Sequence, residues 1–211
     1  MSPATATPPE PGPPPLPPAD LHARRLSLAE YEAARRLWRI HPVDRAPLFF
    51  GPAAGLPPRG RWDAPDGSFG VCYLAEHSFS AFAETFLRDP GVMLLETEDL
   101  QERALARIHV RSPLRLVSMH GAGLHRVGAT AASCMGDYEV SRAWAAALHG
   151  HPDAPDGILY RSRHDDDGLA IALFDRAGPK VKEGDSAPLT DPSNLTFLAE
   201  CLNRYGMGLL G

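Results

Sequence analysis

The sequence predicts an α+β domain built on a mixed, mostly antiparallel sheet core flanked by helices. Strand-like and helix-like segments are interspersed without the regular βαβ repetition that produces a parallel sheet. Two apolar runs, Ile158–Tyr160 and Leu169–Phe174, flank an acidic turn that ends in Asp-Gly, the pattern of an antiparallel hairpin. A length of 211 residues and a hydrophobic content of 44% suit one compact domain with a substantial core.

The first twenty residues differ in composition from the rest of the chain. They contain nine prolines and neither Lys nor Arg, so they lack the basic and apolar regions of a signal peptide. This composition favours a disordered or polyproline II segment, either a solvated leader or a docking site for a proline-binding module. The solvated leader is the simpler interpretation. We therefore assign residues 1–20 to a tail and residues 21–211 to the folded domain.

Charge and cysteine content exclude several classes of protein. The net charge is −5, and the basic residues are scattered along the chain, which argues against direct nucleic-acid binding. Cys72, Cys134 and Cys201 are far apart and form no C-x-x-C pair, which argues against a disulfide framework or a zinc site. No run approaches the roughly 18 apolar residues of a membrane span. We expect a soluble cytoplasmic protein without a metal centre.

Local patterns predict the first elements of the domain. Ser27 and Glu30 have capping-box spacing, which predicts a helix from Ser27 to about Arg36. Residues 37–41 alternate between apolar and polar side chains and predict a strand. A loop rich in Pro and Gly follows over residues 42–60. Loops of this length in compact domains are usually functional or mobile.

The stretch from Arg59 to Glu84 is the centre of the predicted domain. Val71–Leu74 is a short apolar run typical of a buried strand. Ser78 or Ser80 can cap a following helix. That helix has an apolar face at helical spacing, formed by Phe79, Phe82, Ala83 and Phe86. Glu84 lies among these aromatic residues.

The remaining elements follow from periodicity and from turn signals. Strands are predicted over residues 92–95, 104–110 and 113–119, with a short helix from about Thr97. Asp137–His149 reads as a helix. Asp191-Pro192 provides a cap and a proline at the first helical position, which predicts a last helix to about Arg204. Its apolar face favours core packing over an interface.

The common signatures of nucleotide, metal and hydrolase sites are absent. The chain has no G-x-G-x-x-G after a strand, no G-x-x-x-x-G-K-[ST], no H-E-x-x-H and no G-x-S-x-G. His149 and His151 fit a loop better than a metal site. The acidic run after His164 lacks the spaced ligands of a calcium loop, and a solvated turn is the better interpretation. Arg, Tyr, Glu and Ser beside predicted strand ends remain, and they suit an anionic ligand that carries a ring.

Five segments in order make the chain recognisable. The series LWRI, RGRW, VCYLAE, AFAETF and DGILYRSR…IALF resembles the RES-domain family over about residues 37–175. The resemblance implies a fold related to ADP-ribosyltransferases, with NAD as substrate and no metal. It also implies a cytoplasmic bacterial toxin of a toxin–antitoxin pair, with a helix-turn-helix (Xre-like) antitoxin as partner and a homodimer as one arrangement within that complex.

The resemblance also assigns the site residues. The family's two arginines fall on Arg39 in LWRI and Arg61 in RGRW, its aromatic on Tyr73, its Glu on Glu84 and its Ser on Ser162. Taken singly, each of these residues has a structural interpretation, and only their joint order favours a site. Two features depart from the family pattern: an Arg precedes Gly60 where the family has Gly, and the proline-rich tail has no counterpart. In some members of the family a polar residue on the helix that begins near Asp137 is also near the site, and Tyr138, Glu139 and Ser141 are the open candidates for that place.

The implied chemistry is cleavage of the bond between nicotinamide and ribose. Nicotinamide leaves as a neutral molecule, so one carboxylate suffices to stabilise the oxocarbenium-like transition state, and Glu84 would supply it. Arg39 and Arg61 would grip the pyrophosphate. Tyr73 would stack on nicotinamide or ribose, and Ser162 would anchor a ligand hydroxyl or amide.

Three functions are compatible with this site. The favoured one is an NAD-degrading glycohydrolase or phosphorylase, which passes ADP-ribose to water or phosphate. The alternative is a mono-ADP-ribosyltransferase that modifies a protein. A third is a binding module for ADP-ribose-like ligands without turnover, and the joint presence of Arg, Glu and Ser argues against it.

Overall fold

The computed structural model describes residues 12–52 and 55–210. The strands are β1 (Leu28–Tyr31), β2 (Arg36–Pro42), β3 (Val71–Ala75), β4 (Leu94–Glu96), β5 (Arg103–Val110), β6 (Leu114–Met119), β7 (Gly157–Arg161), β8 (Leu169–Phe174), β9 (Val181–Pro188) and β10 (Gly208–Leu210). The α-helices are α1 (Ser78–Phe86), α2 (Thr97–Gln101), α3 (Ala122–Val127), α4 (Ala131–Met135), α5 (Tyr138–His149) and α6 (Leu195–Tyr205). Short 3-10 turns occur at Leu21–Ala23, Asp175–Lys180 and Pro192–Asn194. No helix in these ranges combines the length and the apolar character needed to cross a bilayer.

Eight of the strands form one sheet in the order β1-β6-β7-β8-β3-β2-β5-β9. The pair β6–β7 is parallel, and the other neighbours in this sheet are antiparallel. Strands β4 and β10 form a separate parallel pair. The expected α+β class, with a mixed, mostly antiparallel sheet and flanking helices, is therefore confirmed.

The sheet curls around one of its faces. A single apolar cluster contains buried residues from both ends of the strand order, including Tyr31 of β1, Leu74 of β3 and Val181 of β9. Residues from distant strands share one cluster only if the sheet bends over it. The Tyr31 hydroxyl donates a hydrogen bond to Glu76 Oε1 across this fold, at 2.5 Å. We call this face the inner face of the sheet.

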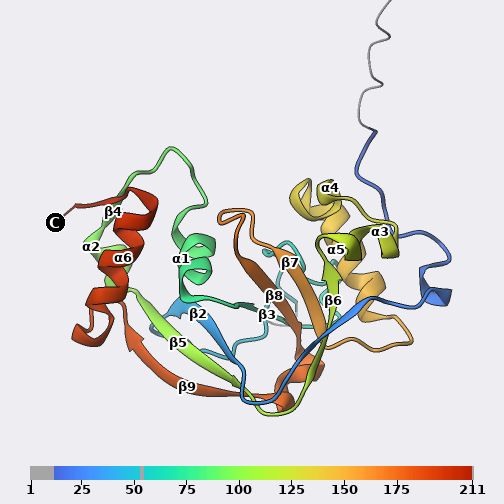
Figure 1. Cartoon of the computed structure of the whole chain (residues 1–211), viewed down its shortest axis with the longest axis horizontal. Helices are drawn as coiled ribbons and strands as arrows, with labels where there is room; N and C mark the ends of the chain where they lie inside the picture. The colour runs from blue at the N-terminus through green and yellow to red at the C-terminus, as the bar shows by residue number, and fades with distance from the viewer. Residues whose placement is uncertain (1–11, 53–54, 211) are drawn as a thin grey trace, which may run out of the picture.

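Two groups of helices cover the outer face. Helix α5 packs over one half in a cluster that includes Trp144 and Tyr160. Helices α1, α2 and α6 cover the other half in a second cluster around Phe82. In Figure 1, α1 stands between α6 on one side and α4 and α5 on the other. A side chain that reaches from α1 toward β7 therefore crosses the boundary between the two clusters.

Much of the predicted local structure is confirmed. Strands β2 and β3 occupy the two expected runs, and β7 and β8 pair as the expected hairpin. Helices α1, α2 and α5 begin at or within one residue of their predicted starts. The cap of α1 differs from the prediction, because His77 is the cap residue and makes no side-chain cap bond.

The predicted helix from Ser27 to Arg36 is wrong. Leu28–Tyr31 forms β1 and pairs antiparallel with β6, and Ala34 then turns the chain with a φ of 70°. A capping box stabilises a helix by only about 1 kcal/mol. Pairing with β6 and burial of Tyr31, which is 3% exposed, outweigh that local preference.

Several elements gave no local signal. Strand β9 is mostly polar and lies at the edge of the sheet, where alternation of buried residues is not required. Strand β10 has three residues, and helices α3 and α4 have six and five, too few for a clear period. These elements depend on contacts with the rest of the domain, which a single sequence window does not contain.

The described part of the proline-rich segment, which begins at residue 12, lies against the domain. The Pro15 carbonyl accepts hydrogen bonds from Trp144 Nε1 at 2.8 Å and from Ser133 Oγ at 3.2 Å. Trp144 and Ser133 are fully buried. The segment from residue 12 therefore fixes α5 to α4, in contrast to the tail that composition predicts. Residues 1–11 of that tail lie outside the described residues, and the domain boundary at residue 20 stays a prediction.

We predict that removing residues 1–18 lowers stability relative to a chain that begins at Gly12. Without Pro15, the buried Trp144 N–H loses its acceptor, which costs about 1–3 kcal/mol. Each kcal/mol corresponds to a melting temperature lower by about 2–4 °C in a chain of this size. Differential scanning calorimetry measures the shift. Equal melting temperatures for the two chains would show that the Pro15 contacts contribute nothing.

Candidate active site

Glu84 and Ser162 meet at the boundary between the two outer clusters. Ser162 Oγ donates a hydrogen bond to Glu84 Oε1 at 2.7 Å. The same Oγ accepts the backbone N–H groups of His164 at 3.2 Å and Asp165 at 3.1 Å. Ser162 is 1% exposed, whereas Glu84 is half-buried. The hydroxyl is therefore fully used, and one carboxylate oxygen of Glu84 is fixed in place.

A second contact one turn earlier on α1 supports this pair. Ser80 is four residues before Glu84, on the same side of the helix. Its Oγ donates to Asp165 Oδ2 at 2.9 Å. A side chain at Gly168 would lie 2.1 Å from Ser80 Oγ, so only glycine allows the turn to approach α1 this closely. The acidic turn that the sequence indicated is thus partly structural, because Asp165 holds it to α1.

Tyr160 completes the site and was not singled out in the sequence. It lies on β7, two residues before Ser162, which follows the last residue of that strand, so both side chains point to the outer face. Burial raises the pKa of Tyr160 well above its ordinary value, and the nearby Glu84 raises this pKa further, whereas Arg61 lowers it. The Tyr160 ring also packs against Trp62, with centroids 5.4 Å apart. In the sequence, the spacing of two residues between Tyr160 and Ser162 was the signal that could have indicated that the two side chains share one face.

Arg61 points into the same region from the loop before β3. Its Nη1 donates to the Gly136 carbonyl at 2.6 Å and to Ser141 Oγ at 3.3 Å, and its guanidinium lies 4.4 Å from the centre of the Tyr138 ring. Arg61 is 8% exposed, and burial lowers the pKa of its guanidinium. Of the three open candidates near α5, Tyr138 and Ser141 contact Arg61, whereas Glu139 is exposed.

The loop that carries Arg61 is held by Asp63 and Tyr73. Asp63 Oδ2 accepts the N–H groups of Arg59 at 2.9 Å and Gly60 at 2.6 Å, and Asp63 Oδ1 accepts the Tyr73 hydroxyl at 2.8 Å. The Tyr73 hydroxyl in turn accepts Trp62 N–H at 2.9 Å. A Cβ on Gly60 would lie 2.2 Å from that hydroxyl. Residue 59 takes part in this network only through its backbone N–H. The loop can therefore keep these bonds with Arg59 at the position where the family has Gly.

Tyr73 therefore positions the loop with its hydroxyl. Burial raises the pKa of Tyr73 well above its ordinary value, and the Asp63 carboxylate raises it further. The ring packs against the same outer cluster as Tyr160. Tyr73 lies on the outer face of the sheet, as Tyr160 does, but its hydroxyl already forms hydrogen bonds with Asp63 and with the Trp62 N–H.

Arg39 is not brought to the site. Its Nη1 donates to the carbonyls of Pro47 at 2.7 Å and Phe49 at 3.2 Å, and lies 2.8 Å from Cys72 Sγ. Cys72 belongs to the inner cluster, and its side chain points away from the face on which neighbouring Tyr73 lies. The sequence predicts that Arg39 grips the pyrophosphate together with Arg61. In the structure the Arg39 side chain holds the loop after β2 on the inner face, whereas Arg61 lies with the outer cluster.

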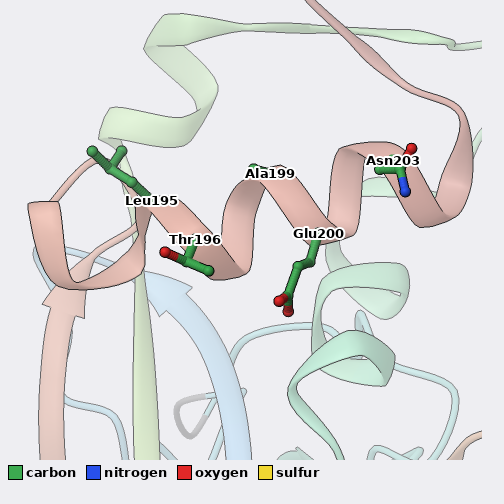
Figure 2. Close-up of a pocket in the computed structure, with 5 residues that line it drawn as sticks. All are labelled: Leu195, Thr196, Ala199, Glu200 and Asn203. Atoms are coloured by element: carbon green, nitrogen blue, oxygen red, sulfur yellow. The ribbon is translucent and has the colours of Figure 1, made fainter.

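Two hollows occur near these elements. One, of about 400 Å³, lies beside the end of α1 and the turn after β7 and includes Arg88 and Arg163 in its lining. The other is a shallow surface on the exposed side of α6, lined by Leu195, Thr196, Ala199, Glu200 and Asn203 (Figure 2). The α6 hollow has one carboxylate and no basic group, so it does not match an anionic ligand. Among the described residues, no three His, Cys, Asp or Glu side chains gather as metal ligands.

The site can stabilise a positive charge next to a bound anion. Glu84 presents a carboxylate with one oxygen fixed by Ser162. Arg61 contributes a buried cation whose Nη1 is bound to the protein, which leaves its other N–H groups for a ligand. Tyr160 lies near both Glu84 and Arg61, and its ring packs on the buried Trp62. A carboxylate held in a partly desolvated place interacts strongly with a developing cation.

Three comparisons relate the sequence and the fold to known proteins. The sequence matches the RES domain family over residues 36–194. It is similar to a protein of Sinorhizobium fredii named probable toxin y4kH, with 37% identity over 94 residues, which are 44% of this chain and 73% of that protein. The fold is similar to a chain in the crystal structure of the M. tuberculosis MbcT–MbcA toxin–antitoxin complex. The TM-score is 0.60 at 19% identity, over 82% of this chain and 92% of that one.

We predict that Ser162→Ala destabilises the domain more than Glu84→Gln does. The alanine leaves the N–H groups of His164 and Asp165 without their acceptor and removes the bond to Glu84, at a cost of about 1–3 kcal/mol. A glutamine at position 84 still accepts the Ser162 hydroxyl through its carbonyl oxygen. Urea denaturation measures both free energies of unfolding. If Ser162→Ala unfolds at the wild-type urea concentration, Ser162 does not position the turn.

Proposed function

This chain belongs to the RES domain family, and on that basis we propose that it is an enzyme that cleaves the bond between nicotinamide and ribose in NAD. The observation that carries the proposal is the Glu84 carboxylate, which Ser162 fixes close to Tyr160, a residue that Arg61 approaches as well. This set offers one carboxylate for a developing cation and one buried arginine for an anion. NAD contains both partners, a ribose that becomes cationic and a diphosphate.

The charge of the leaving group explains why one carboxylate is enough. In NAD the nicotinamide ring is a pyridinium. When its bond to ribose C1′ breaks, the electron pair goes to the ring nitrogen and nicotinamide leaves neutral. Positive charge then develops on C1′ and the ring oxygen of the ribose, and Glu84 stabilises it electrostatically. No acid is needed to protonate the leaving group, in contrast to ordinary glycosidases.

Ser162 acts through Glu84. Its hydroxyl hydrogen bonds to Glu84 Oε1, and its oxygen accepts two backbone N–H groups, so no capacity remains for a ligand. It is a positioning residue, in place of the ligand anchor that the family resemblance implies. Because Oε1 is fixed, Oε2 of Glu84 is the oxygen available to the ribose and its hydroxyls.

Arg61 is the arginine that we assign to the diphosphate of NAD. Its free N–H groups can bind phosphate oxygens as charge-assisted donors. Tyr73 sets the position of Arg61 through the Asp63 loop, and Tyr160 supplies the aromatic surface next to Glu84. Arg39 has a structural role in this proposal, since it binds the carbonyls of Pro47 and Phe49.

The biological role that we propose is the toxin of a bacterial toxin–antitoxin pair, acting in the cytoplasm. The similar Sinorhizobium fredii protein is named a probable toxin, and the similar M. tuberculosis chain is part of a toxin–antitoxin complex. An antitoxin, in our proposal a helix-turn-helix protein of the Xre-like type, would block access to Glu84. NAD is consumed as a substrate, and no metal takes part in this proposal.

We predict that the purified protein releases nicotinamide from NAD, and that Glu84→Gln slows the release by about 10²-fold or more. That factor corresponds to about 2.7 kcal/mol of transition-state stabilisation. The substitution keeps the volume and the bond from Ser162 but removes the charge. Chromatography of nicotinamide measures the rate. Glu98→Gln, at an exposed carboxylate on α2 that has no proposed role in the site, is the matched control and should keep the wild-type rate.

The acceptor of ADP-ribose is identified in the same assay. Water attacks C1′ and loses a proton to yield ADP-ribose, whereas acceleration by inorganic phosphate indicates a phosphorylase. Release that requires added protein, together with labelling of that protein, indicates the alternative, a mono-ADP-ribosyltransferase. Equal rates for wild type and Glu84→Gln would contradict the assigned site. No release under any of these conditions would contradict NAD cleavage itself.

A further inference from the structure

A hollow of about 400 Å³ lies beside the end of α1 and the turn after β7, and its lining also includes Tyr205 of α6 and Met207 just before β10. Arg88 and Arg163 belong to this lining, four residues after Glu84 and one residue after Ser162. Val92, Met93 and Met207 line it as well. The hollow thus combines a cationic part, whose two arginines are close along the chain to the Glu84–Ser162 pair, with an apolar part.

The two arginines of the cationic part have few negative groups in the hollow to neutralise their charge. Arg88 uses Nε for the Glu84 backbone carbonyl at 2.8 Å, which leaves its other N–H groups for a ligand. Arg163 is exposed and forms no ion pair with any residue in the described ranges. Asp89 is the carboxylate in the lining, and its Oδ1 accepts the Gly91 N–H at 3.0 Å. Two arginines that face one space without a paired carboxylate favour an anion there.

His164 adds no positive charge to this group at neutral pH. Burial lowers the pKa of His164, and Arg163 and Arg88 lower it further, against the opposing effect of Glu84. The same two arginines therefore act together on one place in the hollow. This supports the geometric observation that they face a common space.

The apolar part exposes side chains that proteins usually cover. Val92 is 43% exposed and Met93 is 51% exposed, next to the buried Met207. Flexible methionines with a neighbouring branched side chain suit the flat face of an aromatic ring. Tyr205 borders the same hollow, with its ring stacked on Phe82 and its hydroxyl bound to the Phe79 carbonyl.

We propose that this hollow binds the adenylate half of NAD, with Arg88 and Arg163 on the diphosphate and Val92, Met93 and Met207 against the adenine. The chemistry of the lining matches the chemistry of the adenylate half, because the two arginines suit the diphosphate and the apolar wall suits the adenine. Arg88 and Arg163 are also close along the chain to Glu84 and Ser162. In this proposal the diphosphate therefore lies between the adenine and the nicotinamide ribose, as it does in NAD. The inference rests on the proposed NAD cleavage and supplies the second phosphate contact that Arg39, on the inner face, does not provide.

The test is calorimetric titration of the full chain with ADP, which carries the adenine and two phosphates but no nicotinamide ribose. We expect ADP to bind, and Arg163→Ala to weaken the affinity by about tenfold or more, the loss of one charge-assisted contact. Val92→Glu, at an exposed position in the apolar part of the lining, should weaken it to a similar degree. Arg126→Ala on α3 is the matched control and should leave the affinity unchanged, because Arg126 lies outside the hollow.

The outcomes separate this inference from the proposed function. If ADP does not bind, or binds Arg163→Ala and wild type equally, the subsite assignment is wrong even if the enzyme releases nicotinamide from NAD. If ADP binding depends on Arg163 but no nicotinamide is released from NAD, the subsite stands and the cleavage proposal falls. A loss of affinity in Arg126→Ala equal to that in Arg163→Ala would show a general charge effect and would also overturn the assignment.

Discussion

The hydrogen bond from Ser162 to Glu84 joins two parts of the chain that the fold brings together from different clusters. Glu84 belongs to a helix that packs over one half of the sheet, and Ser162 directly follows β7, a strand beneath the other half. The neighbouring bond from Ser80 to Asp165 prevents the turn from moving away from α1. A carboxylate alone on a helix would rotate among its rotamers. Here the curled sheet and the two bonds give it one orientation, and a directed electrostatic effect requires such an orientation.

The loop that carries Arg61 is likewise held in one orientation by hydrogen bonds to neighbouring elements. Asp63 and Tyr73 fix the loop backbone, and Ser141 and Tyr138 on α5 fix the guanidinium. Helix α5 is in turn tied to the proline-rich segment through Trp144 and Pro15. Tyr73, which the sequence analysis expects to contact the ligand, thus supports the loop through its hydroxyl. The groups left for a ligand are the remaining N–H groups of Arg61 and one oxygen of Glu84.

The sequence alone was sufficient to predict those elements whose pattern lies within one short window of residues. The β7–β8 hairpin and α1 follow from alternation, turn residues and helical spacing within one window. The segment after Ser27 was predicted wrongly because its pairing partner, β6, is about 90 residues away along the chain. Likewise, the alternation in β2 shows that Arg39 lies opposite Trp38, but not which face of the sheet holds the site. Tyr160 was predictable in principle, because it is two residues before Ser162 in a segment with strand periodicity. The grouping of Arg88 with Arg163 depends on how α1 meets the β7–β8 turn, which no local pattern encodes.

The central claim is that the Glu84 carboxylate lies next to the anomeric carbon of the nicotinamide ribose. The most direct measurement is a crystal structure of the Glu84→Gln protein with intact NAD bound, since this variant retains the bond from Ser162 and is expected to turn over slowly. The account predicts that C1′ lies in contact with the side chain at position 84 and on the outer face of the sheet. NAD bound with its nicotinamide ribose away from position 84, or on the inner face beside Arg39, would contradict the account.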